Sequence, residues 1–269
     1  MSIIWHNGAF TDDTAIFTAH DRMRLGECVF NTMLAVNDTI IRATPHFEKL
    51  LNGAKIYWGE TPAPPATVDS LLKAGHELLK RNGFLKGHHA VNTIITRGNF
   101  GNGIKPPENP HWQIVMRALP ALDTFPPVHA IIAASACRNE GSPLSQIKCG
   151  NYGENILALR EAMDKGANDA IMLNNKGRIA CATTSNIFIV QDGKLVTPPL
   201  SEGAQNGITR KLVLERLNGL EKPLTPEDLH NAEGIYLTNS LRGVVPLISL
   251  DGQPLPPPSL GIDKDFHLT

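Results

Sequence analysis

The sequence predicts an α+β protein built in two parts. Apolar runs with the alternation of strands and segments with helical spacing are mixed along the chain, without the strict strand–helix repeat of a parallel α/β fold. A stretch with prolines close to both ends, residues 118–127, is typical of a linker. We therefore expect an N-terminal domain over residues 1–117 and a C-terminal domain over residues 128–269.

The composition narrows the class of protein. The chain has 269 residues, 42% of them hydrophobic and 19% charged, which is ordinary for a globular protein. A net charge of −1 gives no reason to expect nucleic acid or a membrane surface as a partner. No apolar run reaches the roughly 18 residues of a membrane helix, and the first residues do not resemble a signal peptide. Four cysteines without metal-ligand spacing predict a reduced, cytoplasmic protein with no metal site.

The N-terminal half predicts strands around two helices. The turns are expected at Asn7–Gly8 and Asn37–Asp38, because these pairs separate apolar runs. A segment rich in Gly, Asn and Pro, residues 99–111, is expected to be an irregular loop. The expected strands are 2–10, 14–20, the two arms of a hairpin over 29–43, 89–98 and 112–119; the expected helices are 46–59 and 67–83.

The C-terminal half predicts more strands and two further helices. A strand at 129–138 leads to a segment that holds Lys148, and a helix over 155–166 follows. The loop 201–207 precedes a second helix over 208–217. The remaining expected strands are 169–174, 178–184, 185–191, 194–199, 232–240 and 244–250.

Two features could carry chemistry. Gly207 precedes a helix whose first turn contains Thr209, so that backbone N–H groups and the helix dipole could bind an anion. The strand end Thr238-Asn239-Ser240 offers further donors. Lys148 lies among small and amide residues rather than in a charged surface, and a lysine with a depressed pKa can attack a carbonyl. Taken singly, the glycine before the helix and the strand end are better explained as a helix cap and a turn, and Lys148 is equally consistent with a surface lysine. Taken together, a phosphate site and a reactive lysine indicate a cofactor with an aldehyde and a phosphate, such as pyridoxal phosphate.

The motifs also resemble a known family. The stretch "IKCGNYGENILALREAMDKGANDAIMLNNKGRIACATTSNIFIVQDGKLVTPP", followed by "NGITRKLV", is similar to the class IV, fold-type IV pyridoxal-phosphate enzymes. This family includes branched-chain and D-amino-acid aminotransferases and 4-amino-4-deoxychorismate lyase. Weaker similarity covers "DRMRLGECVFNTML" and "HFEKLLNGA". The resemblance implies a smaller N-terminal α/β domain, a larger C-terminal domain with a pseudo-barrel of strands, and a homodimer.

The resemblance also assigns roles to residues. Lys148 matches the lysine that holds the cofactor as an aldimine and then moves protons as base and acid. The other positions that it implies for cofactor binding are Lys49, Cys181, Asn186, Gly207, Ile208, Thr209, Asn239 and Ser240. The candidates for substrate binding are Phe30, Thr32, Arg97 and Arg242, although Arg97 could equally have a structural role at a strand end.

Three positions depart from the family pattern. Cys181 stands where the family has a glutamate beside the pyridine nitrogen, and a thiol is neutral at pH 7. Either this weakens the cofactor as an electron sink, or Cys181 only packs and Thr183 or Thr184 serves the nitrogen. Lys49 replaces a phosphate-binding arginine and lacks its bidentate fork. Phe30 replaces the tyrosine of D-amino-acid aminotransferases.

Three functions follow from these observations. The leading hypothesis is an aminotransferase that moves an amino group between a small amino acid and a 2-oxo acid. The second is 4-amino-4-deoxychorismate lyase, which eliminates pyruvate and is favoured by Cys181 and by the Gly-rich loop after Arg97. The third is a pyridoxal-phosphate-binding protein with weak activity.

Overall fold

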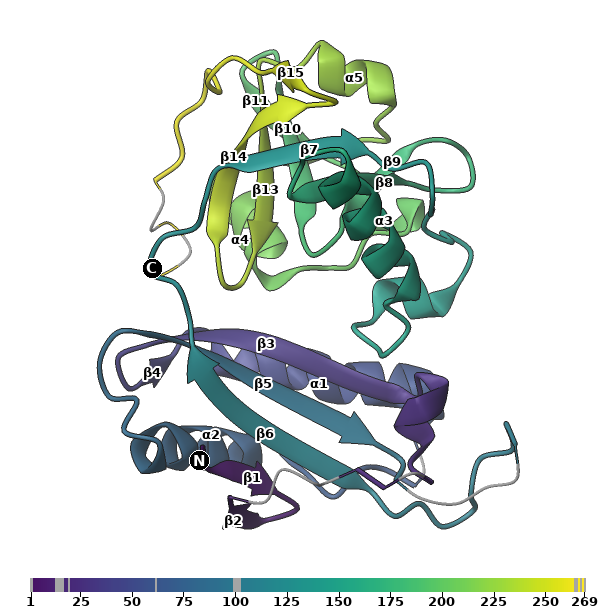
Figure 1. The fold of residues 1–269 in the computed structure, drawn as a ribbon, viewed down its shortest axis with the longest axis vertical. Helices are drawn as coiled ribbons and strands as arrows, with labels where there is room; N and C mark the ends of the chain where they lie inside the picture. Colours follow the sequence, from purple (N-terminus) through teal and green to yellow (C-terminus); the bar gives the residue numbers. More distant parts are fainter. Residues whose placement is uncertain are drawn as a thin grey trace. The chain divides into compact units, whose positions relative to one another are not determined.

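The protein folds into two compact units that do not follow a single cut in the sequence. The computed structural model describes residues 2–12, 17–18, 20–60, 62–98, 103–263, 266 and 268. The first unit comprises Met1–Asp123 with Ile147–Asn151, and the second comprises Thr124–Gln146 with Tyr152–Thr269. Figure 1 shows the ribbon of both units.

The first unit is an antiparallel sheet with two helices. Its six strands lie in the order β2-β1-β6-β5-β3-β4, and each neighbouring pair is antiparallel. The strands are β1 (Ile4–His6), β2 (Ala9–Thr11), β3 (Cys28–Val36), β4 (Thr39–Ile40), β5 (His88–Thr96) and β6 (Gln113–Pro120). The helices are α1 (Ala43–Trp58) and α2 (Val68–Arg81).

Both helices cover the same face of this sheet. Gly53 of α1 approaches Val29, and Gly75 of α2 approaches Met116. The register places Val29 and Met116 on one face, because Val29 pairs with Ile95 and the alternating positions along β5 and β6 continue that face. The side chains of Phe30 and Thr32 therefore lie on the opposite face of β3, which we call the Phe30 face.

The segment Ile147–Asn151 belongs to the first unit because it pairs with the beginning of β3. Val29 and Cys149 form an antiparallel bridge, Phe30 N donates to Lys148 O at 2.9 Å, and Gly150 N donates to Cys28 O at 2.9 Å. The expected division at residues 118–127 includes the first boundary, between Asp123 and Thr124, but it does not include this return of the chain. β6 also extends to Pro120, into the segment expected as a linker.

The second unit is a nine-stranded curled sheet. The order is β12-β11-β10-β13-β14-β7-β8-β9, with β15 paired to β14. The strands are β7 (Val128–Ile132), β8 (Asp169–Leu173), β9 (Ile179–Ala182), β10 (Asn186–Gln191), β11 (Lys194–Thr197), β12 (Leu220–Glu221), β13 (Gly234–Asn239), β14 (Gly243–Leu250) and β15 (Gln253–Pro254). Ile179 of β9 and Val196 of β11, near opposite ends of this order, share one apolar cluster, so the sheet must curl around it.

Three helices complete the second unit: α3 (Gly153–Asp164), α4 (Ile208–Arg216) and α5 (Pro226–His230). α3 packs its buried Ala158 and Ala162 against Met172 of β8. α4 lies beside β13 (Figure 1), where Val213 packs against Tyr236. The α+β class and the curled sheet predicted for the C-terminal part are confirmed.

Most predicted elements are present, and the short strands β12 and β15 are additional to them. The turn at Asn7–Gly8 is correct, but the strand after it is Ala9–Thr11, and the predicted strand 14–20 lies largely outside the described residues. α5 was not predicted. Its signal is in the sequence: Thr225 and Asp228 form a reciprocal capping box around Pro226.

Candidate active site

Lys148 lies on the Phe30 face of the first unit. The antiparallel pairing sets Lys148 opposite Phe30, and residues directly opposite one another share a face of a sheet. The Nζ atom of Lys148 lies 4.7 Å from the centroid of the Phe30 ring, within cation–π distance. The lysine is half-buried. The structure thus brings together Lys148 and Phe30, two of the residues predicted for the site.

Two glycines allow this close pairing. A Cβ atom at Gly150 would lie 2.6 Å from Cys28 Sγ and 2.9 Å from the Gly26 carbonyl oxygen. Gly26 has φ +73°, and a Cβ atom there would lie 2.5 Å from Asn151 Oδ1. Tyr57 OH donates to the Gly26 carbonyl at 3.3 Å and accepts from Asn151 Nδ2 at 3.4 Å. The backbone on both sides of Lys148 is therefore closely fixed.

Positive charge gathers near Lys148. Burial, and after it the charges of Lys49, Lys148 and Arg42, together lower the pKa of His46 in α1 to about 3. His46 is consequently neutral at physiological pH. Lys49, predicted to bind phosphate, and Lys148 thus act on the same imidazole, and this part of the first unit favours an anion.

The second unit contains an anion cradle at the start of α4. The N-cap residue is Gly207, with no side-chain cap, and the first helical hydrogen bond runs from Lys211 N to Gly207 O. The N–H groups of Ile208 and Thr209 precede that bond and point out of the helix. A Cβ atom at Gly207 would collide with Asn186 Oδ1, so the backbone approaches this side chain as only glycine allows.

A buried hydroxyl completes the cradle. Thr238 lies opposite Asn186 in the pairing of β10 and β13, so both side chains lie on the face towards α4. The Oγ1 atom of Thr238 is buried without a hydrogen-bond partner among the described residues. Unsatisfied buried donors are rare in native proteins, and an anion at the α4 N-terminus would satisfy this one. These residues fit a phosphate group. Thr238 was noted in the sequence as a donor at a strand end, but not as a cofactor ligand.

The next turn is shaped by Asn239. Its Oδ1 atom accepts from Leu241 N at 3.0 Å and Arg242 N at 2.8 Å, and its Nδ2 atom donates to Ser185 Oγ at 3.1 Å. Asn239 therefore holds the loop that contains Ser240, and its side chain is already occupied by these bonds.

The two arginines predicted for substrate binding have structural contacts. Arg97 is buried, donates from Nη2 to the Pro107 carbonyl at 3.3 Å, and lies 5.8 Å from the Trp112 ring. Arg242 lies 3.8 Å from the buried carboxylate of Asp169 and 5.6 Å from the Phe125 ring. Each guanidinium thus already has a partner within its own unit.

Cys181 is buried beneath α3. It pairs with Met172 in β8 and packs in the apolar cluster that includes Ala158 and Ala162. Burial raises the pKa of its thiol to about 11; the charge of Arg138 opposes this shift and that of Asp169 adds to it. The thiol is therefore neutral at pH 7. Thr183, the alternative partner suggested by the sequence, donates its hydroxyl to Asp169 Oδ1 at 2.5 Å.

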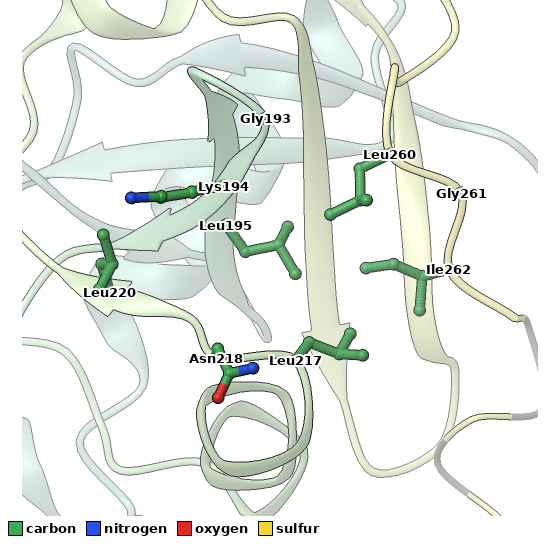
Figure 2. Close-up of a pocket in the computed structure, with 9 residues that line it drawn as sticks. All are labelled: Gly193, Lys194, Leu195, Leu217, Asn218, Leu220, Leu260, Gly261 and Ile262. Atoms are coloured by element: carbon green, nitrogen blue, oxygen red, sulfur yellow. The ribbon is translucent and has the colours of Figure 1, made fainter.

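A separate apolar pocket of about 410 Å³ opens at the other end of α4 (Figure 2). The side chains of Leu195, Leu217 and Leu260 converge on it, with Ile262 beside them. It lies at the carbonyl end of the helix, where the dipole disfavours anions. This pocket is therefore distinct from the phosphate cradle.

Comparison with known proteins defines the class. The family "Amino-transferase class IV" matches residues 28–250, and the chain belongs to this family of pyridoxal-phosphate-dependent transaminases. A putative branched-chain-amino-acid aminotransferase of Methanocaldococcus jannaschii is 28% identical, covering 93% of this chain and 88% of its own.

Solved structures agree with this assignment. A branched-chain aminotransferase from Thermoproteus uzoniensis with norvaline has a TM-score of 0.86 at 27% identity, covering 95% of this chain and 89% of its own. A putative 4-amino-4-deoxychorismate lyase from Legionella pneumophila has a TM-score of 0.83 at 26% identity, covering 91% of each chain. The fold is thus that of the fold-type IV enzymes. Among the described residues no helix is long and apolar enough to cross a membrane.

Proposed function

We propose that this protein binds pyridoxal 5′-phosphate and transfers an amino group between a small amino acid and a 2-oxo acid, with Lys148 as the catalytic amine. The observation that carries the proposal is the position of Lys148: its segment is fixed through Gly150 and Asn151, while its amine remains on the Phe30 face. Within the first unit Lys148 offers an amine of the kind that reacts with an aldehyde, and within the second unit the N-terminus of α4 offers backbone donors for a phosphate.

Pyridoxal phosphate, when bound, supplies an aldehyde that takes up amino groups and a ring that accepts charge from the α-carbon. The residues of this chain do the rest. The N–H groups of Ile208 and Thr209 and the hydroxyl of Thr238 bind the phosphate. With the cofactor bound, Lys148 would take the proton from the α-carbon of the substrate and deliver it to the carbon that carries the aldehyde in the free cofactor. Phe30 lies beneath the amine, 4.7 Å from Nζ to the ring centroid, and covers it on that side.

The names of the relatives support branched-chain aliphatic amino acids as the first donors to assay. The family resemblance further supports a homodimer, and the free cysteines Cys28, Cys137, Cys149 and Cys181 support a reducing, cytoplasmic location. Analytical ultracentrifugation of the purified protein would measure the first of these.

The test is a half-reaction followed by absorbance. The protein with pyridoxal phosphate is mixed with L- and D-amino acids in turn, without any oxo acid. Conversion of the bound cofactor to its amine form by a donor supports the proposal and gives the stereochemistry. Lys148→Ala should lose the absorbance of the lysine-bound cofactor and lower turnover by at least about 10²-fold, the usual contribution of a positioned proton-transfer group. Full activity in this variant would overturn the proposal.

Cys181 favours a second candidate, 4-amino-4-deoxychorismate lyase. A buried neutral thiol, with a pKa near 11, gives the cofactor ring no negative charge, which suits elimination of pyruvate better than repeated amino transfer. Release of pyruvate from aminodeoxychorismate, with no donor converting the cofactor, would support this candidate over the transaminase.

A further inference from the structure

A row of polar side chains crosses the Phe30 face of the first unit. The register pairs Thr32 with Asn92 and Asn92 with Arg117, so these three residues lie side by side on β3, β5 and β6. Asn92 Nδ2 donates to Thr32 Oγ1 at 3.2 Å, which confirms that both side chains lie on this face. The rows on either side are apolar: Phe30, Ile94 and Val115 on one, and Leu34, Ala90 and Leu119 on the other.

Lys148 lies on the same face, beside Phe30 in the row next to this one. Its amine lies above the Phe30 ring, so the side chain is directed from the edge of the sheet over β3. Neighbouring strands are about 4.8 Å apart, which sets the backbone of Arg117 three strands, about 14 Å, and two residues, about 7 Å, away from that of Lys148. Lysine and arginine both have long side chains, so the ends of these two can approach one another more closely than their backbones do.

The charge of Arg117 is not paired with any residue that the structure describes. Arg22 and Arg81 of the same unit pair with Glu27 and Glu77. Within the described residues, no ion pair or hydrogen bond reaches the side chain of Arg117, which is exposed. A guanidinium is a planar fork that matches a carboxylate in bidentate geometry. Arg117 is thus available to a ligand carboxylate.

We infer that Arg117 determines specificity by binding a substrate carboxylate remote from the reacting amino or oxo group, with Asn92 and Thr32 beside it. The inference rests on the proposed function, because Lys148 defines the reacting end. Two classes of substrate carry such a carboxylate: an open-chain dicarboxylic amino or oxo acid, and a ring with an amine opposite a carboxylate. An alkyl or phenyl group at the same place would leave the arginine without a partner.

The experiment measures equilibrium binding to the protein saturated with pyridoxal phosphate, by calorimetry. Glutarate and pentanoate differ by one carboxylate and have no amino or oxo group, so binding is measured without reaction. The wild type should prefer glutarate. Arg117→Met should weaken glutarate binding about 10- to 100-fold and leave pentanoate unchanged, and Arg117→Lys should fall between. Lys73→Met, which removes an exposed charge from α2, is the matched control and should bind as the wild type does.

The ring-shaped class of ligand is tested in the same way, by comparing the binding of 4-aminobenzoate with that of aniline, which lacks the carboxylate. A preference in either pair that depends on Arg117 supports the inference and identifies the class. Equal binding of the carboxylate ligand by wild type and Arg117→Met, an equal loss in Lys73→Met, or no preference in either pair would overturn it. A protein that shows this preference but whose cofactor no donor converts would leave the inference standing and contradict the transaminase proposal alone.

Discussion

Replacing Gly150 with alanine should disturb the segment that holds Lys148. The new Cβ atom would lie 2.6 Å from Cys28 Sγ and 2.9 Å from the Gly26 carbonyl oxygen, and contacts below 3.0 Å force something to move. The sulfur belongs to a buried side chain and the oxygen to backbone that Tyr57 also binds, so neither yields easily. Overpacking of this kind costs about 1–3 kcal/mol. That corresponds to a loss of roughly 2–12 °C in Tm for a protein of this size.

The matched control is Gly153→Ala, three residues further on. A Cβ atom at Gly153 meets nothing within 4 Å, and alanine is the better helix former in the first turn of α3. This variant should keep or slightly raise the Tm. The assay is thermal unfolding of both variants, together with the absorbance of the lysine-bound cofactor. A Gly150→Ala protein with the stability and absorbance of the wild type would refute the reasoning.

Three further outcomes are expected. The pKa of His46 is about 3 in the folded state and near 6.5 in the unfolded state, so the unfolded state binds more protons between these pH values. The free energy of unfolding should therefore decrease as the pH is lowered from about 6.5 towards 3, by about 1.4 kcal/mol per pH unit more than in His46→Gln. Urea unfolding at several pH values would measure this difference. Thr238→Val should weaken the binding of pyridoxal phosphate about 3- to 10-fold. Because it removes a buried hydroxyl without a hydrogen-bond partner among the described residues, it should keep or raise the stability of the cofactor-free protein. Titration with the cofactor would measure the first effect and thermal unfolding the second, and a destabilised variant would contradict this reasoning. A thiol reagent at pH 8 should label Cys137, which is exposed, but not Cys181, whose raised pKa leaves it protonated; peptide mass spectrometry would identify the labelled residue.

Most helices and strands were predicted well because the caps and turns that end them are recognisable from neighbouring residues alone. Helix α2 has a capping box at Thr67 and Ser70, and the Asn37–Asp38 turn joins β3 and β4. The candidate anion cradle at α4 could also be predicted locally, because a glycine directly before a helix leaves the first N–H groups of the helix without a side-chain cap.

Features that depend on the pairing of residues far apart in sequence could not be predicted from local signals. Arg117 interrupts an apolar strand, but its position beside Asn92 depends on how β5 and β6 align across the irregular loop between them. The contact of Arg242 with Asp169 joins positions 73 apart in sequence, and nothing near either residue indicates it. The same holds for Thr238, whose unsatisfied hydroxyl is visible only once Asn186 lies opposite.

The return of Ile147–Asn151 to the first unit has a consequence for synthesis. During translation the chain emerges from its N-terminus, and domains generally fold as units as they appear. The first unit cannot be completed when residue 123 leaves the ribosome; it must wait until residue 151 has emerged, after part of the second unit. A gene fragment that ends at the linker would therefore encode a sheet that lacks the segment beside β3, and Lys148 with it.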